Sequence, residues 1–307
     1  MRVLFVPCTL DGGSRHAGSA LIRCHWLAKY YPGHAEVYDG TQRLEGWDAY
    51  VFQKAYLSSS VQALITRLAA MRDRTGQGAL VFDLCDPDFL EPKHAGRLLE
   101  VLPRFDIATA PTCPLMEWLS TYLPTYMVPD GIDPEAITVR HTFSDVTPPS
   151  IGWVGYSHNV SALEAILPAV HELRGEVDVV TVDTPRPFEV FLRTVARYDI
   201  LLNPRPDIPP FGYKSNNKSL VAWAAGVAVA ETGDALRSLY DPEERKARLA
   251  ERGHAAVTDG HIRNAALLLD KIIGGYLDAS ADGDNNLQSL DLYPGVFSEP
   301  GAVPGQS

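Results

Sequence analysis

Six consecutive polar residues precede an apolar segment in the second half of the chain. They are Lys214, Ser215, Asn216, Asn217, Lys218 and Ser219, and "LVAWAAG" follows them. This change of composition predicts a buried helix over 216–225, with Ser215 and Asn216 as caps of its first turn. The free N–H groups at a helix start attract anions, and the flanking lysines add positive charge. The segment therefore predicts a phosphate site containing Ser215, Asn216 and Asn217.

Arg205 strengthens this interpretation. It follows the apolar pattern "DILLNP" (199–204), and it stands with two lysines against the single acid Asp207 in residues 203–218. That local excess of cations is notable in a chain of net charge -11. We expect Lys214, Lys218 and Arg205 to bind and stabilise phosphate charge. An ordinary solvated helix start with surface lysines is the alternative.

Two other loops combine a strand end with glycine and a following helix. "PCTLDGGSRHAGSA" (7–20) is the first, and "GWVGYSHNVSAL" (152–163) is the second. Glycine allows the backbone to approach a ligand closely, and neither loop has the GxGxxG pattern of a dinucleotide site. A flexible surface turn is the alternative at the first loop, and a surface histidine without a function is the alternative for His158 in the second. The expected phosphate-binding residues are Gly12, Gly13, Gly155 and His158, and the expected substrate-binding residues are Arg15 and His16.

Three aspartates lie at the end of the apolar strand pattern at 79–84 or just after it. In "VFDLCDPDFLEPKH" they are Asp83, Asp86 and Asp88. We expect Asp83 and Asp86 to face a cleft and to accept hydrogen bonds from a hydroxylated substrate. An Asp-x-Asp pair after a strand can also hold a divalent metal, so a metal site at Asp86 and Asp88 is the alternative. Pro87 stiffens the turn between them, which counts against that alternative.

The elements that must position these loops alternate between strand patterns, such as those at 49–53 and 79–84, and helix patterns, such as those at 18–31 and 159–173. This alternation predicts an α/β protein with two doubly wound, Rossmann-like domains facing each other across a cleft. Ligands bind at the carboxyl ends of strands in such sheets, where these loops lie. The expected units are an N-terminal domain at 1–140, a C-terminal domain at 141–258, a terminal helix at 259–278 that crosses back to the first domain, and a disordered acidic tail at 279–307.

Composition excludes several classes of protein. The chain has 307 residues, 46% of them hydrophobic, and no run of about 20 apolar residues, so no membrane span is expected. The net charge of -11 disfavours nucleic acid binding by bulk charge. The four cysteines form no CxxC pair, which predicts reduced thiols and a cytoplasmic location.

Four segments in order resemble the GT-B glycosyltransferases, the large retaining family that uses nucleotide sugars. They are "DGGSRHAGSALIRCHWLA" (11–28), "VPDGID" (128–133), "IGWVGY" (151–156) and "YDILLNPRPD" with "KSLVAWAAGVAVAE". The resemblance implies transfer of a sugar from a nucleoside diphosphate sugar to a hydroxyl of a glycan, small molecule or modified DNA base. It implies that the N-terminal domain takes the acceptor and the C-terminal domain the donor. No cofactor is expected, because the cations substitute for a metal at the diphosphate.

The sequence departs from that family at two positions. Many members have two glutamates eight residues apart in the donor segment, and the second binds the donor ribose. Tyr213 and Val221 occupy those positions here. A non-catalytic nucleotide-sugar-binding protein, a metal-dependent transferase using Asp86 and Asp88, and a phage-type transferase acting on hydroxylated DNA bases are the alternative interpretations.

Overall fold

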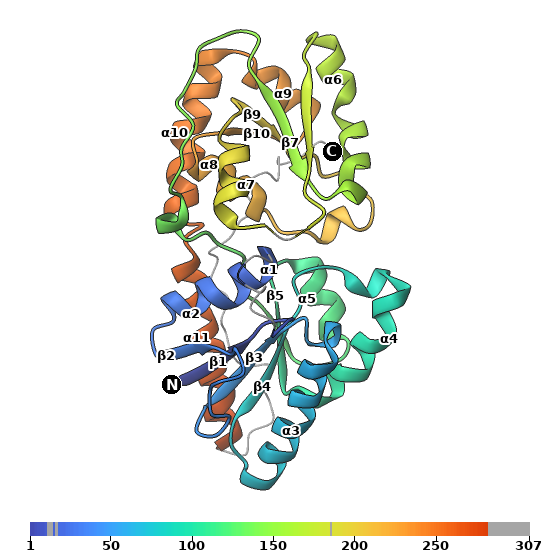
Figure 1. Ribbon diagram of the computed structural model, residues 1–307, viewed down its shortest axis with the longest axis vertical. Coiled ribbons are helices and arrows are strands. Elements are labelled where there is room, and N and C mark those ends of the chain that lie inside the picture. The colour runs from blue at the N-terminus through green and yellow to red at the C-terminus, as the bar shows by residue number, and fades with distance from the viewer. Residues whose placement is uncertain (11–14, 16–17, 185, 282–307) are drawn as a thin grey trace, which may run out of the picture.

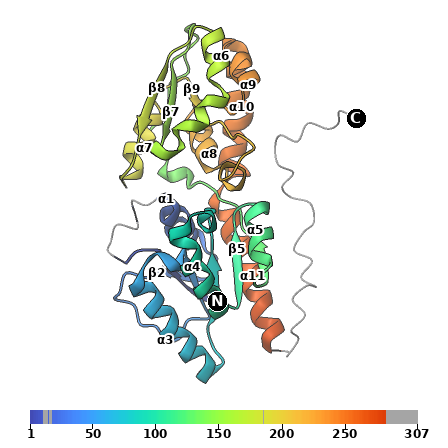
Figure 2. The same cartoon turned by 90° about the vertical axis from the view of Figure 1, so that its right-hand side faces the viewer.

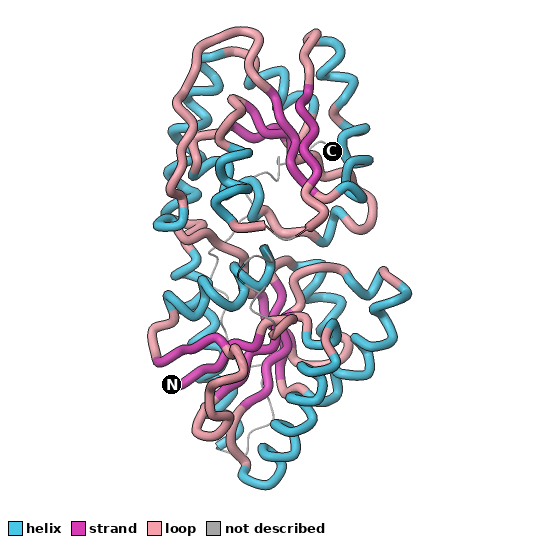
Figure 3. The backbone as a smooth tube through the Cα atoms, viewed as in Figure 1, coloured by secondary structure: helices cyan, strands magenta, loops and turns pink. Residues whose placement is uncertain are grey.

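The computed structural model describes residues 1–10, 15, 18–184 and 186–281. These residues form a mixed α/β structure with two parallel sheets, which Figure 3 shows as two separate groups of strands. The first sheet lies in the lower half of Figure 1, and the second lies in the upper half. The α/β class and the parallel sheets expected from the sequence are therefore confirmed.

The first sheet has six parallel strands in the order β2-β1-β3-β4-β5-β6. Strands β3 and β4 are buried at every position, which explains their continuous apolar sequences. Because the strands are parallel, the loops after β1, β3, β4, β5 and β6 meet at one edge of the sheet. The bounds are β1 Arg2–Val6, β2 His34–Val37, β3 Ala49–Gln53, β4 Ala79–Asp83, β5 Ile107–Ala110 and β6 Thr125–Met127.

Helices cover both faces of the first sheet. The helix expected over 18–31 is continuous over residues 18–30, but its middle is π-helical: α1 Gly18–Ala20, the π-helical turn η2 Leu21–Trp26 and α2 Leu27–Tyr30 follow one another without a break. A π-helical turn is wider than an α-helical one, and Arg23 within it is 1% exposed. The other helices are η3 Ala55–Leu57, α3 Ser59–Thr75, η4 Asp88–Leu90, α4 Pro92–Val101, η5 Leu102–Arg104, α5 Cys113–Ser120 and η6 Pro134–Ala136.

The second sheet has four parallel strands in the order β10-β9-β7-β8. The strands are β7 Ile151–Gly155, β8 Val177–Thr181, β9 Ile200–Leu202 and β10 Ala228–Ala230. The helix expected over 159–173 is divided into a 3-10 helix, η7 Ser157–Ala165, and α6 Leu167–Glu172, which has a proline in its first turn. The remaining helices are α7 Phe188–Val195, η8 Phe211–Tyr213, α8 Asn217–Ala224, α9 Gly233–Leu239 and α10 Pro242–Thr258.

The last helix, α11 Ile262–Ala281, runs beside the first sheet and packs against α2 (Figures 1 and 2). It ends three residues beyond the expected limit of 278, and residues 282–307 of the expected tail lie outside the described residues. The backbone N–H of Ile262 donates to the Ile132 carbonyl at 2.9 Å, at the start of this helix. Among the helices described, none combines the length and apolarity needed to cross a bilayer.

One apolar core joins the first sheet to helix α8. It contains Val3 and Phe5 of β1, Leu269 of α11, and Val221 and Ala224 of α8. Helix α8 is therefore held by a core that includes residues of the first sheet. The polar residues at its N-terminus lie outside that core, where residues that follow strands of both sheets come together.

Candidate functional site

A cleft of about 880 Å³ is lined by loops that follow strands of both sheets. Residues from the first sheet's side include Lys54, Asp86 and Asp130, and those from the second include Gly155 and Lys218. This is the edge at which open parallel sheets bind ligands. Of the residues expected to bind phosphate or substrate, the cleft brings together Asp86, Gly155, His158, Arg205, Lys214, Ser215, Asn217 and Lys218.

Lys218 is the partly buried cation at the centre of this group. Its Nζ lies over the Trp153 ring, 5.4 Å from the ring centroid, and no ion pair or hydrogen bond joins it to another of the described residues. Burial lowers the pKa of Lys218 to about 8, and the nearby positive charges of Lys214 and Arg205 contribute to that decrease. The positive charge of this ammonium is not balanced by a carboxylate of the described residues. An anionic ligand could therefore pair with it.

Lys214 lies nearby on residues 213–218, which we call the cation segment. Its Nζ donates to Asn159 Oδ1 at 3.1 Å, and burial lowers the pKa of Lys214. Asp86 across the cleft opposes that pKa shift, so the positive charge of Lys214 faces a carboxylate of the first sheet's side. Lys214 is thus placed between the two walls of the cleft.

Arg205 contacts the main chain of the cation segment. Its two Nη atoms donate to the carbonyls of Lys214 at 3.2 Å and Ser215 at 2.7 Å. Its Nε also lies 3.7 Å from Glu231. Arg205 therefore fixes the path of the segment as well as contributing positive charge to the cleft.

The expected capping of helix α8 is wrong in its details. Asn216 occupies the N-cap position, but its side chain makes no capping hydrogen bond. Ser215 Oγ donates instead to Asp130, and Asn217 Nδ2 donates to the Gly131 carbonyl at 3.0 Å. The side chains of Ser215 and Asn217 therefore tie the cation segment to the first sheet's side. The first-turn N–H groups of α8 are left without a side-chain cap, as an anion site requires.

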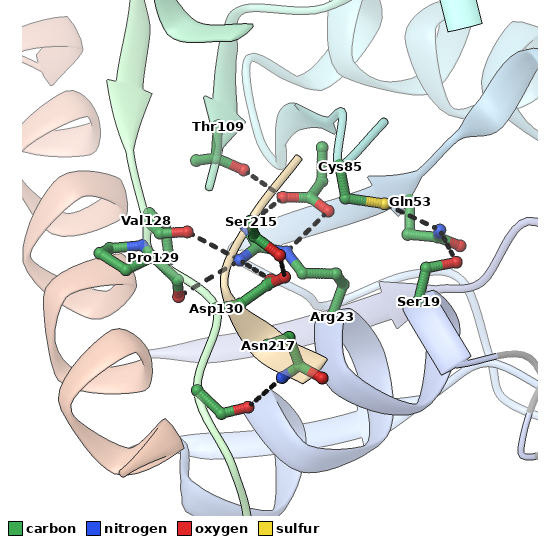
Figure 4. Close-up of polar contacts among 12 residues, drawn as sticks. Ser19, Arg23, Gln53, Cys85, Thr109, Val128, Pro129, Asp130, Ser215 and Asn217 are labelled. Carbon is green, nitrogen blue, oxygen red and sulfur yellow. Dashed lines mark hydrogen bonds and ion pairs between the residues drawn. The ribbon is translucent and has the colours of Figure 1, made fainter. Parts of the chain in front are cut away.

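A buried arginine, which sequence reasoning missed, lies under the cation segment. The Arg23 guanidinium donates to both carboxylate oxygens of Asp83, at 3.1 and 2.5 Å, and to Asp130 Oδ1 at 3.1 Å (Figure 4). It also donates to the Val128 carbonyl at 2.7 Å. The sequence signal was an arginine within the apolar helical pattern "LIRCHWLA", where an unpaired charge could not be buried.

Asp83 is not available to a substrate, contrary to expectation. Its side chain is 1% exposed, and Thr109 Oγ1 donates to Oδ1 at 2.7 Å in addition to the two bonds from Arg23. Beside it, Gln53 Oε1 accepts a hydrogen bond from the Cys8 backbone N–H. Gln53 Nε2 donates to Ser19 Oγ, as Figure 4 shows. The side chains at the end of β4 therefore hydrogen-bond to their protein neighbours beneath the cleft, and Asp83 is not open to a ligand.

Lys54, also missed, lies between the two aspartates of the alternative metal site. Its Nζ is 2.7 Å from Asp86 and 2.9 Å from Asp88, and Tyr56 donates to Asp88. Lys54 has φ of 48°, in the left-handed region that non-glycine residues rarely adopt. Its ammonium neutralises the charge that would attract a divalent cation. Asp86 itself is 37% exposed and remains open to the cleft.

A glycine is needed at position 155 because the Trp153 ring leaves no space for a side chain there. A Cβ at this position would lie 2.8 Å from the Trp153 ring and 3.4 Å from Lys218 Nζ. The glycine thus allows both groups to approach the end of β7. His158 is exposed, stacks on Tyr156 and bonds with Asn159, so it lies at the rim of the cleft.

Three expected residues of the first glycine loop, Gly12, Gly13 and His16, lie outside the described residues. Arg15 is exposed and is absent from the described lining of the cleft. The loop therefore adds none of these four residues to the described site.

The half of the cleft next to α7 is apolar. Trp26 and Phe188 meet edge to face with centroids 5.2 Å apart, and Phe191 lies beside Phe188. Leu21 and Val182 also line this part. The cleft thus combines a cationic region with an apolar region, which suits a ligand that has a phosphate group joined to a planar or apolar group.

The two positions where the resembling family has glutamates offer no carboxylate. Val221 is 1% exposed within the core, and the Tyr213 ring packs against Phe89, with centroids 5.3 Å apart. No family model matches the sequence, and no curated protein matches it. A functional assignment therefore depends on the geometry and charge of the cleft.

Proposed function

We propose that this protein is a glycosyltransferase that moves a sugar from a nucleoside diphosphate sugar to a hydroxyl acceptor. In this proposal the two sheets belong to two Rossmann-like domains of the GT-B type, which face each other across the cleft. The observation that carries it is the partly buried Lys218 ammonium, which has no hydrogen-bonding or ionic partner among the described residues and lies in a cleft lined from both sheets.

The cationic region suits the leaving group of such a reaction. Breaking the bond between sugar and diphosphate leaves additional negative charge on the phosphate oxygens. Lys214, Lys218 and the first-turn N–H groups of α8 would stabilise that charge, because fixed donors act most strongly where charge develops in a protected site. Arg205 supports them by holding the carbonyls of the cation segment.

The other parts of the cleft fit the rest of the substrates. The apolar region around Trp26 and Phe188 suits the planar base of the donor. Asp86 is partly exposed on the opposite wall and suits a hydroxyl of the acceptor or of the sugar. Retention of the anomeric configuration and independence from metal are expected from the resemblance, and the pairing of Lys54 with Asp86 and Asp88 favours metal independence.

A thermal-shift screen of nucleoside diphosphates and nucleotide sugars tests the proposal. A true ligand raises the unfolding temperature by mass action in the wild type. The increase should be lost in Lys218→Ala and kept in Lys246→Ala, because Lys246 is exposed on α10. A ligand that stabilises the wild type and Lys218→Ala equally would contradict the phosphate site.

A non-catalytic nucleotide-sugar-binding protein is the second candidate. Tyr213 and Val221 favour it, because neither position can supply the carboxylate with which many members of the resembling family bind the donor ribose. Calorimetry combined with an assay for released nucleotide separates the two functions. Tight binding without nucleotide release across a panel of glycan, small-molecule and hydroxylated-base acceptors would support the second candidate.

A further inference from the structure

The cation segment is anchored to the first sheet's side by residues that lie between its two lysines and just before them. Lys214 and Lys218 line the cleft, whereas the residues between and before them make hydrogen bonds to loops that follow β5 and β6. The three bonds run from Thr112 Oγ1 to the Tyr213 carbonyl at 3.0 Å, from Ser215 Oγ to Asp130 Oδ2 at 2.5 Å, and from Asn217 Nδ2 to the Gly131 carbonyl at 3.0 Å.

Among these three bonds, the one at Asp130 has a charged acceptor. Hydrogen bonds to an ionised carboxylate are about twice as strong as those between neutral groups. The other oxygen of Asp130 accepts from Arg23, whose guanidinium is also fixed by Asp83. Asp130 is therefore held rigidly from the first sheet's side and presents one oxygen to Ser215 (Figure 4).

We propose that Asp130 is a positioning residue for the anion site of the proposed function. It binds Ser215 and thereby holds Lys214 and Lys218 where both can contact a diphosphate. Each carboxylate oxygen of Asp130 already accepts from a protein donor and the side chain is 7% exposed, so we assign its effect to Ser215 and not to a direct contact with the ligand.

The physical basis is preorganisation. A segment that is free to move must lose conformational entropy when it binds. Anchoring the segment before the ligand arrives removes part of that cost. The charge state of Asp130 matters too, since burial raises its pKa while Arg23 and the Ser215 hydroxyl oppose that rise.

Hydrogen exchange in the full chain without ligand tests the anchoring. Asp130→Asn and Ser215→Ala should each increase amide exchange in residues 213–218, whereas Ser215→Thr should not, because it keeps the hydroxyl. Thr138→Val is the matched control, since it removes the hydrogen bond to Glu189 of α7 and leaves the cation segment untouched. Unchanged exchange in both Asp130→Asn and Ser215→Ala would overturn the inference.

Calorimetry with inorganic pyrophosphate tests the consequence for binding. Asp130→Asn and Ser215→Ala should each weaken binding about tenfold, which corresponds to about 1.4 kcal/mol. The double variant should lose little more than either single variant, because both changes act on the same contact, one by removing the charge of the acceptor and the other by removing the donor. Additive losses, or affinities within twofold of the wild type, would contradict the inference.

These two measurements also separate this inference from the function on which it rests. If the wild type binds neither pyrophosphate nor any nucleoside diphosphate, the proposed function is wrong, while the exchange data still decide whether Asp130 anchors the segment. If the wild type binds and the Asp130 and Ser215 variants behave like it, the function stands and the positioning role is wrong.

Discussion

The Lys218 ammonium lies over the face of the Trp153 indole, with Nζ 5.4 Å from the ring centroid. Trp153 belongs to strand β7 and is 2% exposed, so the ring is a fixed, apolar support. A cation–π contact stabilises an ammonium only modestly, by about 0.5–2 kcal/mol. It therefore holds Lys218 in place without neutralising its charge, and this leaves the charge for a ligand.

Removal of the Lys218 ammonium should lower activity and raise the stability of the protein without ligand. If the protein transfers a glycosyl group, Lys218→Ala should lower turnover about 10²-fold, as the loss of one fixed donor to developing charge does. Lys218→Met should raise stability without ligand by about 1 kcal/mol at pH 7, because an uncompensated charge leaves a partly buried site. Steady-state kinetics and urea unfolding measure the two effects. Turnover that is unchanged in both Lys218→Ala and Lys214→Ala would refute the phosphate assignment.

The stability difference between wild type and Lys218→Met should depend on pH. The pKa of Lys218 is 10.5 in the unfolded chain and about 8 in the fold. Below pH 8 both states carry the proton, so the folded wild type bears the full cost of the buried charge. Between pH 8 and 10.5 the unfolded state binds more protons, and the stability of the wild type therefore rises relative to the variant. Urea unfolding of both proteins at about pH 7, 8 and 9.5 measures the change, and a constant difference would contradict it.

Gly155→Ala should weaken anion binding. The added Cβ would lie 2.8 Å from the Trp153 ring, so the ring over which Lys218 Nζ lies must shift. We expect about a tenfold loss of pyrophosphate affinity, equivalent to about 1.4 kcal/mol. Gly212→Ala is the matched control, because a Cβ there meets nothing within 4 Å. Equal affinities of the two variants would argue against a role for Gly155.

Lys54→Gln should destabilise the fold through the two aspartates that it leaves behind. Lys54 is 9% exposed and pairs with both Asp86 and Asp88. Removing one partner from a buried ionic group costs about 3 kcal/mol, which urea unfolding would detect. Lys93→Gln is the control, since Lys93 is 72% exposed beside Glu91 and should change stability by less than about 0.5 kcal/mol.

The ion pairs of Lys54 with Asp86 and Asp88 also predict the effect of removing metal ions. Because the Lys54 ammonium occupies the space between the carboxylates, EDTA should leave turnover unchanged, and Asp88→Ala should act on stability more than on the chemical step. Turnover abolished by EDTA and restored by Mg²⁺ would instead support the metal-dependent alternative.

Much of the fold could be predicted from the pattern of apolar residues within short segments. The apolar runs at 49–53 and 79–84 are central strands of a parallel sheet, because strands buried on both faces need apolar residues throughout. The helical geometry was predicted less well, since the helix expected at 18–31 contains a π-helical turn and the helix expected at 159–173 is divided into a 3-10 helix and a short α-helix. Neither the π-helical turn that contains the buried Arg23 nor the 3-10 geometry ahead of the proline in α6 follows from periodicity alone.

The sequence by itself determined the α/β class, the parallel strands and the positive charge at the start of helix α8. Those features depend on residue type and short-range spacing, which a single segment contains. Only the tertiary structure decided which polar residues are free and which are occupied: Asp83 is enclosed by Arg23, Ser215 binds Asp130, and Lys54 pairs with Asp86. The partners in these pairs are far apart in the chain, by 60 residues for the first and 85 for the second, so they meet only after the sheets and loops have packed.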